Sequence, residues 1–281
     1  MYRVSVYSNG NDLIINDGMK YHIVGISGLS PVNATINSSR ISGGDGGMFN
    51  SASVGMRNIV MTILPNHPVA ENRQALYKLF GVKNKITLKY STETRDVQID
   101  GYVESVQVDL FEKRQRVQIS ILCMQPFFKS AQEIIDELSA VVGMFEFPFE
   151  SEEEGVVFSE SVVIRRAVIN NAGDVPCGAI FRMIATGRVL NPVIYNADDT
   201  TSYKLNIEMQ TGDEIVIDTQ RGSKSVFLIR DGQRSNIINN RAPNITWFQL
   251  PVGESTFTYD ADEGAESLTI SIGHYNLFGG V

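Results

Sequence analysis

The sequence has few of the residues that build metal, redox and catalytic centres. Its 281 residues include two cysteines, three histidines and one tryptophan. Cys123 and Cys177 stand far apart in the chain, so we expect free buried thiols in a protein made in a reducing cytoplasm. Neither cysteine has a ligand-like spacing with His22, His67 or His274, and no metal site is expected.

Long apolar runs and a positive charge excess are also lacking. No apolar run approaches the roughly 18 residues that span a bilayer, and no apolar signal region follows the first residues, so neither a membrane nor a signal segment is expected. The net charge is −8. Affinity for nucleic acid comes largely from lysine and arginine side chains that displace counterions, so no sequence-specific nucleic-acid partner is expected.

Motifs of the familiar enzyme classes are missing as well. No nucleophile-elbow motif indicates a Ser-His-Asp site. The acidic run at residues 150–154 could serve glycoside hydrolysis only if two carboxylates faced a sugar from opposite sides of a cleft, and a solvated linker is the favoured interpretation. We therefore expect a protein that is not an enzyme and that holds no cofactor.

What the sequence does contain is a glycine cluster, Gly43-Gly44-Asp45-Gly46-Gly47, followed by Met48 and Phe49. Glycine adopts positive φ freely and lets another backbone come close. The cluster neither opens a helix after a strand nor precedes a Walker lysine, which disfavours a phosphate loop. The segment is therefore either an ordinary loop or an arm that docks on a neighbouring element or subunit.

Charge and composition divide the chain near residue 150. Residues 1–135 carry 14 basic and 11 acidic side chains, whereas residues 136–281 carry 10 and 21. The stretch 136–155 holds an aromatic segment with Pro148 beside the acidic run, which is typical of a linker. We predict a first domain at 1–135 and a second at 156–281.

The two predicted domains differ in pattern, and together they predict a mainly β fold. In the first, alternating strands surround helical spacing at residues 69–80, which predicts an α+β arrangement of antiparallel sheet with one helix across it. A capping box at residues 130–133 predicts a second, short helix. In the second domain, about ten short strands with turns at intervals of about 8 to 12 residues predict a two-sheet β-sandwich.

Several motifs carry a family resemblance through their order and spacing. They are Phe49-Asn50-Ser51-Ala52, Gly101-Tyr102-Val103-Glu104, Asn191-Pro192, Gly212-Asp213 and Tyr275-Asn276-Leu277-Phe278-Gly279-Gly280-Val281, among others. Along nearly the whole chain they resemble the distal tail proteins of long-tailed siphophages that infect Gram-positive bacteria.

The resemblance implies a structural virion protein. Its N-terminal domain would be tail-tube-like and would form a hexameric ring at the tip of a long non-contractile tail, with a galectin-like or carbohydrate-module-like sandwich outside. The implied partners are further copies of the chain, the major tail tube protein, the tail-associated lysin, and receptor-binding or other baseplate proteins. The implied location is the virion tail tip, after synthesis in the host cytoplasm.

Family members also embrace the next subunit with an extended arm. The resemblance implies that this arm covers about residues 38–53, with the interface at residues 43–49. Met48 and Phe49 would then be its apolar anchors.

A second function stays open, namely recognition of host cell-wall glycans by the C-terminal sandwich. Carbohydrate modules stack sugar rings on exposed aromatic side chains, for which Trp247, Tyr203 and Tyr259 are candidates. The competing interpretation, which we favour, is that Trp247 faces the core. The basic cluster at residues 113–116 is likewise predicted to be a solvated hairpin turn, with a contact to DNA inside a ring as the alternative.

Overall fold

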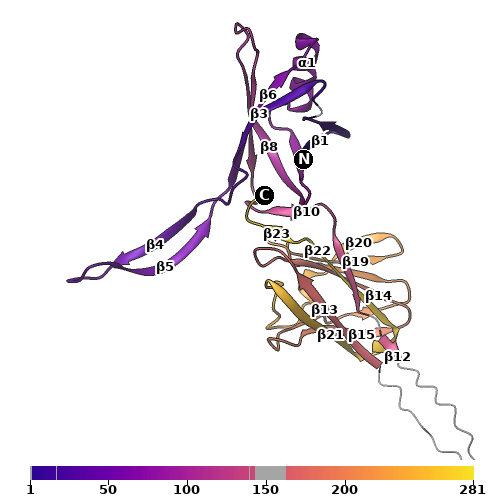
Figure 1. Cartoon of the computed structure of the whole chain (residues 1–281). Coiled ribbons are helices and arrows are strands. Elements are labelled where there is room, and N and C mark those ends of the chain that lie inside the picture. Colours follow the sequence, from indigo (N-terminus) through magenta and orange to yellow (C-terminus); the bar gives the residue numbers. More distant parts are fainter. Residues whose placement is uncertain (1, 17, 139, 143–162) are drawn as a thin grey trace, which may run out of the picture. The chain divides into compact units, whose positions relative to one another are not determined.

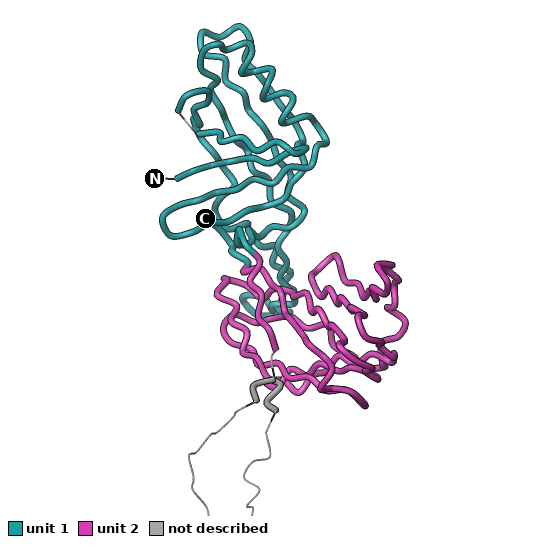
Figure 2. Tube along the Cα trace, turned by 90° about the vertical axis from the view of Figure 1, so that its right-hand side faces the viewer, with its two compact units in different colours: residues 1–132, 277–281 teal, residues 133–276 magenta. Residues whose placement is uncertain are grey.

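The computed structural model describes residues 2–16, 18–138, 140–142 and 163–281. The chain forms two compact units, which are unit 1 (residues 1–132 and 277–281) and unit 2 (residues 133–276) (Figure 2). The units therefore divide after Gln132 rather than near residue 150, and the last five residues return to unit 1. The aromatic segment and acidic run of the predicted linker lie outside the described residues.

Unit 1 is built on an antiparallel sheet with the strand order β2-β1-β7-β8-β9-β6-β3 (Figure 1). Along β6 every second side chain is buried, because successive side chains of a strand point to opposite faces. The strands are β1 (Arg3–Ser8), β2 (Asn11–Ile14), β3 (Tyr21–Ser27), β6 (Arg57–Pro65), β7 (Lys85–Ser91), β8 (Asp96–Val108) and β9 (Val117–Cys123).

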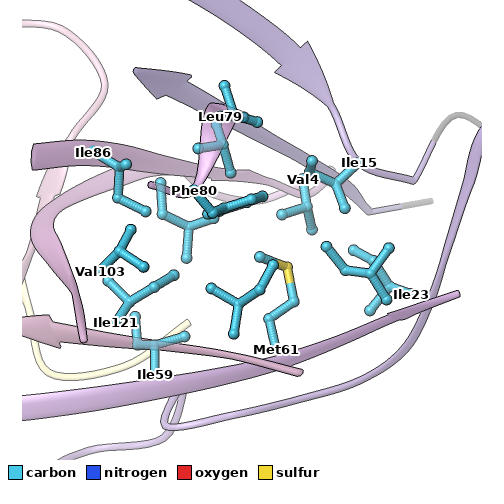
Figure 3. Close-up of a cluster of buried hydrophobic side chains, with 14 of the residues drawn as sticks. Val4, Ile15, Ile23, Ile59, Met61, Leu79, Phe80, Ile86, Val103 and Ile121 are labelled. Carbon is cyan, nitrogen blue, oxygen red and sulfur yellow. The ribbon is translucent and has the colours of Figure 1, made fainter. Parts of the chain in front are cut away.

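One α-helix, α1 (Val69–Leu79), covers this core among the described residues. Leu76 and the following Phe80 are fully buried, and Figure 3 shows Phe80 among aliphatic side chains of the sheet such as Ile86, Val103 and Met61. The predicted combination of one helix with an antiparallel sheet is confirmed.

The largest buried side chain of unit 1 is a cation. Arg57 is 1% exposed. Its Nε donates to the carbonyl of Pro126 (2.6 Å), its Nη1 to those of Ser30 (2.8 Å) and Gly28, and its Nη2 to that of Gly279 (2.6 Å). Buried charges need such partners because desolvation is costly. One side chain thus joins three segments that lie far apart in the sequence.

The C-terminal residues complete unit 1 as a short strand. β23 (Leu277–Phe278) pairs with β10 (Phe128–Ser130), which also pairs with β8. The guanidinium of Arg57 lies 4.5 Å from the ring centroid of Phe128. Unit 2 is therefore inserted between two neighbouring strands of unit 1, a connection that local sequence patterns do not reveal.

The short helix predicted from the capping box is wrong. Ile134–Leu138 is strand β11, which pairs with β22 (Leu268–His274). The hydroxyl of Ser130 donates to the carbonyl of Gln132 at 2.8 Å instead of capping a helix. Burial along β11 alternates between partly buried or buried and exposed side chains, as it does in a strand with one face against a core.

Unit 2 consists of two antiparallel sheets, with the orders β11-β22-β14-β18-β19-β20 and β12-β13-β21-β15-β16, the latter with β17 beside β15. The ring centroids of Phe181, in the first sheet, and Phe257, in the second, are 5.5 Å apart, so the two sheets bury aromatic side chains against each other. The mainly β fold is confirmed. The remaining elements are β12 (Ala140–Val142), β13 (Val163–Asn171), β14 (Ala179–Ala185), β15 (Val189–Asn196), β16 (Ser202–Lys204), β17 (Glu208–Met209), β18 (Glu214–Asp218), β19 (Ser225–Arg230), β20 (Gln233–Asn236), η1 (Ile238–Asn240), β21 (Gly253–Glu263) and η2 (Ala265–Ser267).

A buried carboxylate gives unit 2 a predicted dependence on pH. Asp213 is 2% exposed and accepts hydrogen bonds from Arg230, with Nη2 at 2.5 Å from Oδ2. This hydrogen bond holds the pKa of Asp213 below its usual value. The pair therefore stabilises unit 2 above the unfolded pKa of about 3.9, and this contribution is lost as the pH falls through the folded pKa.

Replacing Arg230 by methionine should destabilise unit 2 at neutral pH, and this loss should shrink as the solution is acidified below about pH 4. Urea unfolding at a series of pH values measures the difference. Arg234→Met is the control, because Arg234 lies 3.6 Å from the ring centroid of Phe227 and forms no ion pair with a described carboxylate. An Arg230→Met loss that stayed constant to low pH would show that the ion pair contributes nothing.

Candidate functional site

A β-hairpin, which we call the arm, is the most exposed element of unit 1. It consists of β4 (Ala34–Arg40) and β5 (Gly47–Val54), which form a sheet of their own (Figure 1). Every residue of both strands is exposed. The predicted arm at residues 38–53 thus falls within a longer hairpin.

The glycines of the arm serve its turn. Gly43 and Gly46 have φ values of 79° and 94°, which glycine adopts without strain. A Cβ on either residue would meet no atom within 4 Å, so no close contact inside the chain requires them. Asp45, between them in the turn, is exposed.

The arm exposes several large apolar side chains. Phe49 is 65% exposed, Met48 61% and Ile36 58%. A two-stranded hairpin is marginally stable in water unless it packs on something, and contiguous exposed apolar surface usually marks an interaction site. Nothing within the described part of the chain covers these side chains.

The register of the arm sorts its side chains between two faces. Residues directly opposite each other in an antiparallel pair share a face, and the register pairs Ala34 with Val54, and Ile36 with Ala52. A β-bulge after Asn37 then shifts the register so that Ser38 pairs with Phe49. A β-bulge adds one residue to one strand of a pair, here to β5. If the strands paired without that residue, Phe49 would lie on the opposite face of the arm. The bulge therefore gathers the apolar residues Ala34, Ile36, Phe49, Ala52 and Val54 on one face, which also carries Ser38 and Arg40 and which we call the apolar face.

The other face of the arm is mostly polar. The Nδ2 of Asn37 donates to Oγ of Ser51 (3.0 Å), and Oγ of Ser39 donates to Oδ1 of Asn50 (3.2 Å). Met48 pairs with Ser39 and so belongs to this polar face. The two predicted anchors are thus separated, because consecutive strand residues point to opposite sides.

The three aromatic residues predicted for sugar stacking do not form a stacking surface. Tyr203 is fully buried, and burial raises the pKa of its hydroxyl. Tyr259 is 5% exposed, and its hydroxyl donates to the carbonyl of Leu268 at 3.0 Å. Buried rings cannot stack on a sugar, so the prediction is wrong for these two residues. Trp247 is partly exposed.

Two residues that the sequence analysis did not single out have marked environments. Arg57 is the buried cation of unit 1. Phe111, in the connection between β8 and β9, is fully exposed and lies next to the basic cluster at residues 113–116. Phe111 could have been noticed from the sequence, because it is an aromatic residue beside basic residues in a predicted hairpin turn. No local pattern marks Arg57.

The cysteines and the metal-binding residue types were the remaining candidates for a chemical site. Cys123 and Cys177 are free and buried, as predicted, and burial raises the pKa of each thiol to about 11. Among the described residues no three His, Cys, Asp or Glu side chains come close enough together to hold a metal ion. None of the helices described here has the length and apolar character to cross a membrane.

Comparisons with known proteins agree with the sequence resemblance. Residues 172–272 match the family model of the siphovirus-type tail component, C-terminal domain. The fold matches SPP1 Dit, described as a paradigm of the hub adsorption apparatus in phages that infect Gram-positive bacteria, with a TM-score of 0.69, 13% identity, and coverage of 98% of this chain and 99% of that one.

A second solved structure, the phage P2 baseplate in its activated conformation with Ca, contains a chain that matches with a TM-score of 0.59 at 13% identity. That match covers 97% of this chain and 98% of the other. The comparison with curated proteins gives no match. The family model thus confirms the resemblance for residues 172–272, and the solved structures show a shared fold along nearly the whole chain.

Proposed function

We propose that this chain, whose residues 172–272 match the siphovirus-type tail component family and whose whole length has the fold of a phage hub protein, is a structural protein of a long phage tail. The observation that carries the proposal is the match of both units at once, over 98% of the chain. Neither unit presents a catalytic centre among its described residues, which supports a role in assembly.

Within the tail, we propose that copies of the chain form a closed ring, six in number by resemblance to the family. A ring is a heterologous assembly, in which one patch of each subunit meets a different patch on the next. The arm supplies such a patch, because its apolar face has no cover within the described chain. Phe49 is the largest side chain of that face and is its proposed anchor.

The ring would stand at the tail tip of the virion. One side would meet the major tail tube protein and the other the tail-associated lysin, with receptor-binding or other baseplate proteins as further partners. The fold match to hub proteins supports this placement, while the identity of each contact surface is part of the proposal.

Deleting residues 41–49 tests the role of the arm. We expect this variant to run as a folded monomer on a sizing column, because it lacks the turn and the Phe49 half of the apolar face. Replacing residues 41–46 with a glycine-serine linker of equal length is the matched control, and it should keep the ring because both strands remain. A ring formed by the deletion variant would contradict the proposal.

A further inference from the structure

A cavity of about 460 Å³ lies in unit 1 between two connections of the chain. One wall comes from residues within 64–69, where β6 ends and α1 begins, and the other from residues 113–115, in the connection between β8 and β9. Small-molecule sites have volumes of about 300 to 1,000 Å³. The cavity is therefore large enough for an organic molecule rather than a single small ion.

Hydrogen bonds tie both walls of this cavity to α1. Nη1 of Arg73, on the helix, donates to Oε1 of Gln115, and Nε2 of Gln115 donates to the carbonyl of Leu110 at 3.0 Å. On the other wall, Nδ2 of Asn72 donates to the carbonyl of Asn66 at 2.9 Å. The cavity is therefore formed before any ligand arrives, which lowers the cost of binding.

The cavity is lined by cations that lack counter-ions. Lys113 and Arg114 both line it, and neither forms a hydrogen bond or an ion pair with a residue that the structure describes. The Nε of Arg73 is buried and also has no acceptor in the described part of the chain. None of the lining residues is acidic, and the neighbouring Glu71 and Glu112 are exposed and lie outside the lining. The cavity therefore favours an anion.

The charge and the opposite wall together define the kind of anion. Two unpaired cations on one cavity match a single group with nearly two negative charges, and a phosphate monoester carries about 1.5 to 2 at neutral pH. Arginine presents a rigid fork of donors to phosphate oxygens, and lysine adds a compact charge. The other wall includes Leu64, Pro65 and Val69, which suit an apolar group attached to the phosphate.

We propose that this cavity binds a phosphate monoester of an apolar or aromatic group. Lys113 and Arg114 bind the phosphate oxygens, and Leu64, Pro65 and Val69 contact the carbon group. A nucleic-acid strand fits less well, because each phosphate inside a strand carries one negative charge. The inference is independent of ring formation, so either can fail without the other.

Isothermal titration calorimetry of the full chain with phenyl phosphate tests the site. We expect saturable binding at one site per chain, weaker binding of inorganic phosphate, and no binding of phenol. Lys113→Gln and Arg114→Gln should each weaken the affinity for phenyl phosphate about tenfold, the loss expected for one charge-assisted hydrogen bond. Arg116→Gln is the matched control, because Arg116 belongs to the same basic cluster but does not line the cavity.

The apolar wall has a test of its own. Leu64→Ser should lower the affinity for phenyl phosphate toward that for inorganic phosphate, and it should leave the binding of inorganic phosphate unchanged. Circular dichroism of each variant shows that the fold is intact before titration. Equal affinities of the unmodified chain for phenyl phosphate and inorganic phosphate would overturn the assignment of an organic monoester.

Three further results would also overturn the proposal. They are the absence of binding heat with phenyl phosphate, undiminished binding by the double variant Lys113→Gln, Arg114→Gln, and an equal loss in Arg116→Gln, which would show that the charge of the cluster acts without the cavity. Tighter binding of a single-stranded oligonucleotide than of phenyl phosphate would assign the basic residues to a nucleic acid instead.

Discussion

Replacing Arg57 by methionine is expected to lower the free energy of unfolding of unit 1 by about 2 to 4 kcal/mol, because hydrogen bonds of a charged donor contribute about 1.5 to 3 kcal/mol each and the cost of burying the charge offsets part of their sum. The substitution leaves the carbonyls of Gly28, Ser30, Pro126 and Gly279 without their shared donor. A buried acceptor without a partner retains its desolvation cost. Differential scanning calorimetry of the full chain measures the loss as a lower Tm for unit 1.

Two further variants show whether burial and shape cause this effect. Arg57→Lys keeps the charge but lacks the guanidinium fork, so we expect most of the loss to persist. Arg95 is the matched control, because it also donates to a carbonyl of the C-terminal segment, that of Gly280 at 2.8 Å, but lies at the surface. Arg95→Met should cost less than about 1 kcal/mol. Equal losses for Arg57→Met and Arg95→Met would contradict a special role for the buried cation.

Local periodicity was enough to predict much of the fold. Alternation predicts the strands of the first domain, and β6 shows it as alternate buried side chains. The apolar spacing of residues 69–80 likewise matches α1 with Leu76 and Phe80 in the core. These predictions succeed because a strand or helix with one buried face carries its period in its own residues.

Contacts between distant residues could not be predicted in this way. Arg57 binds the carbonyl of Gly279, and β23 pairs with β10, although these segments lie at opposite sides of a long insertion in the sequence. The helix predicted from the capping box at Ser130 was wrong for a related reason. Its residues allow a helix locally, whereas pairing with β22 requires a strand, and tertiary pairing decides.

The faces of the candidate site also depend on register. The sequence suggested Met48 and Phe49 together as anchors, but the β-bulge that places Phe49 with Ile36 and Ala52 is a property of the paired strands. In the same way, residue type alone did not distinguish the aromatic residues of unit 2 that are exposed enough to stack on a sugar from those that are buried. Burial of Tyr203 and Tyr259 follows from the positions of their strands in the sandwich.

The arm provides the second large expected effect. Phe49→Asp places a charge on the apolar face, where ring closure would bury it, and an unpaired buried charge costs several kcal/mol. Met48→Asp introduces the same charge at the neighbouring position, which is 61% exposed and lies on the polar face. We therefore expect Phe49→Asp to abolish the ring and Met48→Asp to leave it largely intact, with both variants folded as shown by circular dichroism.

The most direct test of ring formation through the arm is native mass spectrometry of three proteins at one concentration, namely the unmodified chain, Met48→Asp and Phe49→Asp. We predict the mass of a closed ring, six copies by family resemblance, for the first two and the mass of a monomer for Phe49→Asp. An unmodified chain that is monomeric, or a Phe49→Asp ring as abundant as the unmodified one, would contradict assembly through the apolar face of the arm.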